Sequence, residues 1–79
     1  METERVEALI EAGLPGARVQ VTGDGRHFEA LVVSDAFEGK SRRQRHRMVY
    51  EAVGALMETD IHALSINAYT DAERPEFQL

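Results

Sequence analysis

Residues 28–58 read FEALVVSDAFEGKSRRQRHRMVYEAVGALME, and this stretch decides the fold. Its first six residues, 28–33, are apolar at nearly every position apart from Glu29, which predicts a central strand with both faces partly covered. The next six, 34–39, are rich in turn-forming residues and contain one large apolar side chain, Phe37. We expect Phe37 to anchor this connection to the core.

A long helix is expected after the connection. Ser41 is a natural N-cap, and the helix is predicted to run from about residue 42 to residue 58. Side chains at helical spacing predict the face on which this helix packs. They are His46, Val49, Tyr50, Val53, Leu56 and Met57.

The segments on either side predict one more helix and two more strands. Residues 4–12 form a short amphipathic pattern that ends at Gly13, a residue suited to the left-handed position after a helix. Residues 18–22 alternate β-branched and polar side chains and predict a half-buried strand, which residues 23–26 join to the next strand as a hairpin turn. Residues 61–69 also alternate, and predict a third strand.

The order of these elements predicts a single α/β domain over residues 1–79. Residues 70–73 (TDAE) fit a capping box that opens a helical turn, which Pro75 should cut short. A strand–helix–strand crossover of this length favours parallel pairing and a right-handed connection. We therefore expect a small sandwich: a three-stranded mixed sheet with the helices on one face and a short C-terminal helix.

Composition excludes several classes of function. The chain has 79 residues, 43% of them hydrophobic and 29% charged, which is typical of a soluble globular domain. It has no cysteine, so a disulfide, a thiol nucleophile and a cluster held by its own cysteines are all excluded. The absence of a long apolar run and the acidic N-terminal sequence predict a cytoplasmic protein. The net charge of −5 argues against general coating of nucleic acid.

One basic segment stands out against this acidic total. It holds five of the nine basic residues: Lys40, Arg42, Arg43, Arg45 and Arg47. Cations are disfavoured at the first turns of a helix, so the segment could be an anion site that receives a phosphate, a carboxylate or a nucleic-acid backbone. It could equally be a solvated face helped by Glu38 and Glu51. The arginines point in several directions around the helix and cannot all line one groove.

The three histidines are the remaining candidates for chemistry. His46 lies on the apolar stripe and is expected to be a packed residue at the edge of the core. His27 follows the hairpin turn and His62 opens the third strand, so both stand at ends of elements, where ligands can be exposed on rigid supports. Two histidines do not make a closed metal site, and a partner would have to supply other ligands. No nucleophile and base can be assigned, and we expect no enzymatic activity.

Three motifs, in this order, resemble the BolA family. They are VVSDAFEGKS at residues 32–41, RHRMVY at 45–50 and IHALSI at 61–66. The resemblance spans nearly the whole chain. Residues 21–28 (VTGDGRHF) are similar to the IbaG (YrbA) branch, whose hairpin loop is short. The chain departs from the family pattern near its end, where TDAER at residues 70–74 replaces the usual T-P-x-E-W.

The resemblance implies a fold similar to class II KH domains and two activities. The first is binding of a monothiol glutaredoxin and sharing of a [2Fe–2S] cluster with it and glutathione, for cluster assembly, transfer or sensing, with His62 and His27 as ligands. The second is DNA binding and transcriptional regulation linked to stress, envelope and cell shape. Its contacts would be Lys40, Ser41, Arg42, Arg43, Arg45 and Arg47. A third alternative is an interaction module whose arginine face docks an acidic partner without metal.

Overall fold

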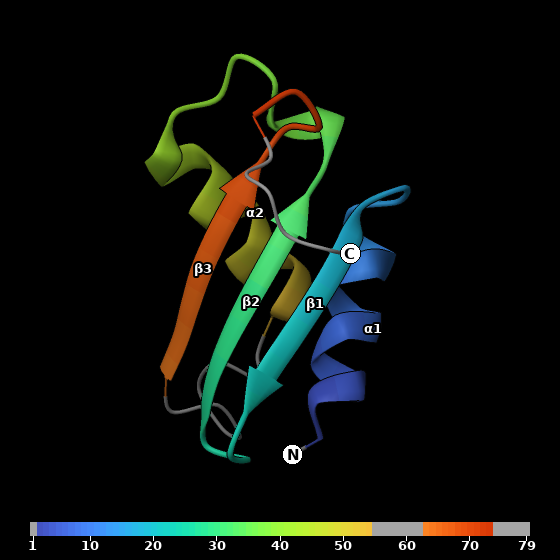
Figure 1. Cartoon of the computed structure of the whole chain (residues 1–79), viewed down its shortest axis with the longest axis vertical. Coiled ribbons are helices and arrows are strands. Elements are labelled where there is room, and N and C mark those ends of the chain that lie inside the picture. Colours follow the sequence, from blue (N-terminus) through green and yellow to red (C-terminus); the bar gives the residue numbers. More distant parts are fainter. Residues whose placement is uncertain (1, 55–62, 74–79) are drawn as a thin grey trace.

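The computed structural model describes residues 2–54 and 63–73, and its elements follow the predicted order (Figure 1). The elements are the helix α1 (Thr3–Gly13), the strands β1 (Arg18–Gly23) and β2 (His27–Val33), the 3-10 turn η1 (Asp35–Phe37), the helix α2 (Arg42–Val53) and the strand β3 (Ala63–Tyr69). Residues 61 and 62, predicted to begin the third strand, lie outside the described residues.

The three strands form one mixed sheet in the order β1-β2-β3. β1 is antiparallel to β2, with Val21 opposite Ala30, and β2 is parallel to β3, with His27 opposite Ala63. Both helices lie on the same face of this sheet, α1 behind β1 and α2 behind the other two strands (Figure 1). The predicted mixed sheet, its central strand and the one-sided helix layer are confirmed.

The core lies between that helix layer and the sheet. It takes two fully buried residues from α1, Val6 and Ile10, and further apolar side chains from all three strands and α2. Phe37 is also fully buried, which confirms that it anchors the connection between β2 and α2. Burying a side chain of this size stabilises the fold by roughly 1.5–3 kcal/mol. The start of α2 is therefore fixed against the core.

The predicted extent of α2 is wrong at its C-terminal end. The helix ends at Val53, because Gly54 takes a positive φ of 67° while its N–H still bonds the carbonyl of Tyr50. Gly54 therefore stops the helix before residue 58, and the predicted stripe residues Leu56 and Met57 lie outside the described residues.

The role predicted for Gly13 is also wrong. Gly13 is the last residue of α1 and does not adopt a positive φ; Gly16 does, at 87°. A Cβ atom on Gly13 would lie 2.5 Å from the Cβ of Ala52 in α2. Glycine is thus required here because the two helices approach closely, and not because the backbone is left-handed.

Candidate functional site

His27, the first of the two predicted cluster ligands, stands at the exposed start of β2. Its side chain is 68% exposed. The carboxylate of Asp24 accepts hydrogen bonds of 2.9 Å from the backbone N–H groups of both Arg26 and His27. These two bonds, that from His27 foremost, lower the pKa of Asp24 to about 2. The hairpin turn is thereby fixed by an ionised carboxylate.

The same carboxylate faces the imidazole. Its second oxygen, Oδ2, lies 3.7 Å from Nδ1 of His27. At this distance the pair is a close approach and not a hydrogen bond. His27 is thus exposed with one ring nitrogen near a carboxylate, and its predicted role as a cluster ligand stays a prediction.

The second predicted ligand, His62, lies outside the described residues. The residue that follows it in the sequence, Ala63, is the register partner of His27. Neighbouring strands of a sheet run about 4.8 Å apart, so the backbones of His27 and Ala63 are adjacent. Over residues 2–54 and 63–73, no group of three or more His, Cys, Asp or Glu could hold a metal ion, so His27 is not part of a closed site within that part of the chain.

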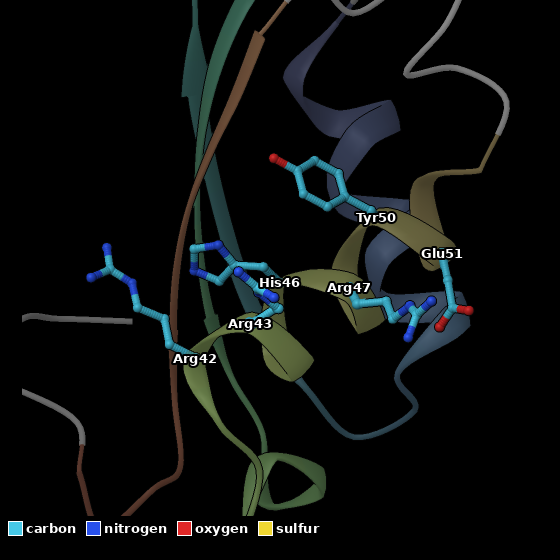
Figure 2. Close-up of a pocket in the computed structure, with 6 residues that line it drawn as sticks. All are labelled: Arg42, Arg43, His46, Arg47, Tyr50 and Glu51. Carbon is cyan, nitrogen blue, oxygen red and sulfur yellow. The ribbon is translucent and has the colours of Figure 1, made fainter.

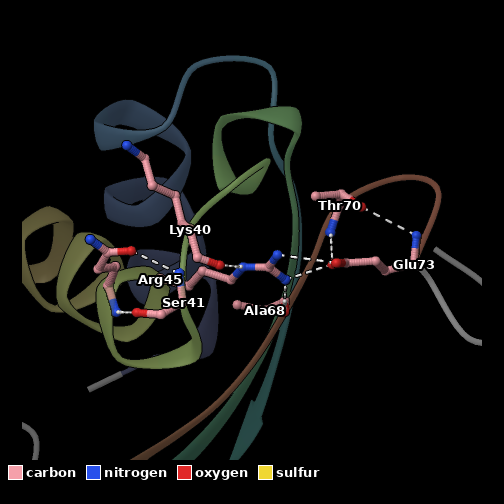
Figure 3. A network of polar contacts seen from close by, with 7 residues as sticks. Lys40, Ser41, Arg45, Ala68, Thr70 and Glu73 are labelled. Carbon is pink, nitrogen blue, oxygen red and sulfur yellow. Dashed lines mark hydrogen bonds and ion pairs between the residues drawn. The ribbon is translucent and has the colours of Figure 1, made fainter.

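The basic segment begins with a structural cap. The Ser41 hydroxyl accepts a hydrogen bond of 3.2 Å from the N–H of Gln44, and the Gln44 side chain accepts one of 2.8 Å from the N–H of Ser41 (Figure 3). The predicted N-cap is thus confirmed as a full capping box. The Ser41 hydroxyl already serves the helix, whereas its predicted contact with an anion stays a prediction.

Arg45 turns into the domain, where its side chain is largely buried. Its guanidinium donates two hydrogen bonds, of 2.5 and 3.1 Å, to the carboxylate of Glu73, one of 3.2 Å to the carbonyl of Ala68 and one of 2.9 Å to that of Lys40 (Figure 3). It also lies 5.9 Å from the ring centroid of Phe37. Arg45 therefore ties the start of α2 to the end of β3.

This ion pair changes the titration of both partners. The Arg45 guanidinium, followed by the N–H of Thr70, lowers the pKa of Glu73 to about 2, and hydrogen bonding to Glu73 raises the pKa of Arg45. Glu73 also closes the predicted capping box, since it accepts from the N–H of Thr70 at 3.0 Å and donates its own N–H to the Thr70 hydroxyl at 3.2 Å. The box is confirmed; Pro75 lies outside the described residues.

The remaining three arginines share one face of α2. They line a shallow pocket together with one acidic and two ring-bearing side chains (Figure 2). The lining residues are Arg42, Arg43, His46, Arg47, Tyr50 and Glu51. The expectation that the arginines could not all share one groove is confirmed, because Arg45 is turned elsewhere.

His46 lies half-buried in this pocket, in agreement with its predicted place at the edge of the core. Burial, and then the charge of Arg42, lower the pKa of His46, so its ring is mostly neutral at pH 7. Tyr50, predicted to pack on the same stripe, is 39% exposed and donates a 3.3 Å hydrogen bond from its hydroxyl to the carbonyl of Leu64. The face therefore offers three cations beside two rings.

A second groove, which the sequence did not reveal, runs between the start of α2 and β3. The α2 side of the groove is formed by Lys40, Arg42, Arg45 and His46, and the other side by residues 66–69 and Glu73. Its residues come from segments at least twenty positions apart, so no local spacing pattern could have indicated it. Among the helices described in the structure, none is long and apolar enough to span a membrane.

Comparison with known proteins agrees with this fold and these motifs. The family model for BolA-like proteins matches residues 10–73. The chain is 40% identical to the acid stress protein IbaG of Escherichia coli K12 over 77 residues, 92% of this chain and 88% of that protein. It is 31% identical over 83 residues to the DNA-binding transcriptional regulator BolA of the same organism, covering 92% of this chain and 79% of that protein.

Two solved structures give the same result in three dimensions. A BolA homologue from Coxiella burnetii superimposes with a TM-score of 0.84 and 46% sequence identity, covering 91% of this chain and 94% of that one. BolA1 from Arabidopsis thaliana matches with a TM-score of 0.81 and 30% identity, over 95% of this chain and 100% of the other. Since a family model covers most of the chain and relatives match it nearly end to end, the chain belongs to the BolA family as an IbaG-like member.

Proposed function

We propose that this protein is a non-enzymatic adaptor that binds a monothiol glutaredoxin and shares a [2Fe–2S] cluster with it and with glutathione. It would act in the assembly, transfer or sensing of iron–sulfur clusters. The observation that supports this most is the placement of His27. Its exposed imidazole is backed by Asp24 and stands opposite Ala63, the residue that follows His62.

The chemistry of the available ligands fits a shared cluster. Cluster irons accept thiolate or imidazole ligands, and this chain has no cysteine. His27 and His62 could supply two of the four ligands, and a glutaredoxin cysteine and glutathione would supply the two thiolates. Imidazole ligation raises the potential of such a cluster relative to all-thiolate ligation. The cluster would supply one-electron chemistry, or would itself be the cargo.

Anaerobic reconstitution of a monothiol glutaredoxin with iron, sulfide and glutathione, with and without this protein, tests the proposal. We expect a visible absorption and circular dichroism spectrum distinct from that of glutaredoxin alone. His27→Ala and His62→Ala should abolish it, whereas the matched control His46→Ala should retain it. A spectrum unchanged by the protein, with no complex on gel filtration, would remove this function.

DNA binding is the second candidate. It is favoured by the three arginines on one face of α2 and by the relative named a DNA-binding transcriptional regulator. Gel-shift assays at two salt concentrations separate the two functions, because phosphate contacts weaken steeply as salt rises. Binding that Arg43→Glu removes and His62→Ala preserves would support the regulator, and the absence of any shift at low salt would exclude it.

A further inference from the structure

The edge of the sheet at β3 carries backbone groups that no other strand of the described sheet uses. On the side facing β2, the carbonyl of Tyr69 accepts from the N–H of Ser34 at 2.9 Å, and the N–H of Ala63 donates to the carbonyl of Arg26 at 3.4 Å. Backbone groups alternate between the two sides of a strand, so those of Leu64, Ile66 and Ala68 point away from β2. β3 is the last strand in the sheet order.

Two side chains of α2 cover part of this edge. The Tyr50 hydroxyl donates to the carbonyl of Leu64 at 3.3 Å, and Arg45 donates to that of Ala68 at 3.2 Å. Between the carbonyls of Leu64 and Ala68, the N–H and C=O of Ile66 also point away from β2. They have no hydrogen-bond partner within residues 2–54 and 63–73. The N–H of Ile66 is thus an available donor and its C=O an available acceptor for another extended backbone, between two carbonyls that α2 side chains already bond.

A groove of about 550 Å³ lies along this part of the edge. Arg42 is exposed on its α2 side, whereas the ammonium group of Lys40 points away from Ala68 and Glu73 (Figure 3), and the charge of Glu73 is matched by Arg45. Over residues 2–54 and 63–73 no acidic side chain pairs with Arg42, so an occupant of the groove meets its positive charge.

We propose that the β3 edge at Ile66 binds an extended acidic segment of a partner protein by strand addition. The backbone of the segment would bond the N–H and C=O of Ile66, and a carboxylate on the side of the segment that faces α2 would reach Arg42. A second copy of this chain fits poorly, because edge-to-edge pairing would bring the same cations together. A nucleic-acid strand carries a charge on every nucleotide and would also meet Glu73, whereas a peptide can place its charges on one side only.

This proposal stands apart from the shared cluster. It uses the middle of β3 and the start of α2, and neither His27 nor His62 takes part. Loss of cluster sharing in a histidine variant would therefore leave peptide binding intact, and the two proposals can fail separately.

Fluorescence anisotropy with the full chain tests the binding. The probe is a fluorescein-labelled eight-residue peptide in which glutamate alternates with valine, and the control peptide is N-methylated on its central backbone nitrogens. Loss of two backbone hydrogen bonds should weaken binding about 10-fold or more. Arg42→Glu should weaken it to a similar degree, since two charges of like sign then meet. The matched control Arg5→Glu, an exposed arginine of α1, should change it less than about 2-fold.

Amide hydrogen exchange locates the contact. The peptide should slow exchange at Ile66 and leave Ser65 and Asn67, whose N–H groups point toward β2, unchanged. Equal binding of the N-methylated peptide, no saturable binding, or unaltered exchange at Ile66 would each overturn the proposal. So would displacement of the peptide by an oligothymidylate that binds more tightly through the same groove.

Discussion

Arg45 is the residue at which the basic segment divides into a structural part and an exposed part. Its side chain is only 13% exposed and joins α2 to the carbonyl of Ala68 and the carboxylate of Glu73. Arg42, Arg43 and Arg47 line an open pocket and make no such contacts with the part of the chain that the structure describes. Substitution of the two kinds of arginine should therefore have different consequences.

Arg45→Met should destabilise the fold by about 1–3 kcal/mol. The methionine keeps much of the apolar stem but leaves the carbonyls of Ala68 and Lys40 without their donor. Urea unfolding followed by circular dichroism measures the difference. The matched control, Arg43→Met, removes an exposed charge and should change the free energy of unfolding by less than about 0.5 kcal/mol. Equal effects of the two variants would show that Arg45 is not a structural residue.

At the scale of the element, the start of α2 depends on its capping box. Ser41→Ala removes the hydroxyl that accepts from the N–H of Gln44, and should cost about 1 kcal/mol in the free energy of unfolding. Ser41→Thr retains an acceptor and should restore most of the loss. If alanine and threonine variants unfold at the same urea concentration as the wild type, the cap does not contribute to stability.

The contact between α1 and α2 gives a second prediction at this scale. Glycine to alanine usually stabilises a helix by about 0.5–1 kcal/mol. At Gly13 the new Cβ would lie 2.5 Å from that of Ala52, so Gly13→Ala should instead destabilise the protein by about 1–3 kcal/mol. The double variant Gly13→Ala/Ala52→Gly should lose less than the sum of the two single variants, as thermal unfolding would show. A more stable Gly13→Ala protein would contradict the close approach.

At the scale of the whole molecule, the sequence predicted those features of the fold that depend on the local spacing of apolar residues. The apolar run at residues 28–33 predicted the central strand. The length of the strand–helix–strand connection that follows predicted that the third strand would pair parallel to it. The end of α2 was missed because the apolar stripe continues past Gly54, whose positive φ stops the helix. Periodicity reports which faces are apolar, but not where a backbone turns left-handed.

The candidate site was predicted in part for the same reason. The position of His27 at the end of an element was evident from the turn that precedes it, but the alignment of Asp24 with its ring was not. The contact of Arg45 with Glu73 joins residues 28 positions apart, and the free edge at Ile66 emerges only once the strand order is known. Such features depend on tertiary structure, which short sequence patterns do not specify.

Two carboxylates, one in the turn between β1 and β2 and the other after the end of β3, should make the whole fold sensitive to acid. The pKa values of Asp24 and Glu73 are about 2 in the folded protein, against ordinary values of 3.8 and 4.5. The unfolded chain therefore takes up protons first as the pH falls, and stability that is present above about pH 4.5 should be lost progressively down to about pH 2. Urea unfolding across this range measures the slope. Asp24→Asn and Glu73→Gln should each flatten it, and additively, because the two sites share no contact. An unaltered slope in both variants would assign the acid sensitivity to other carboxylates.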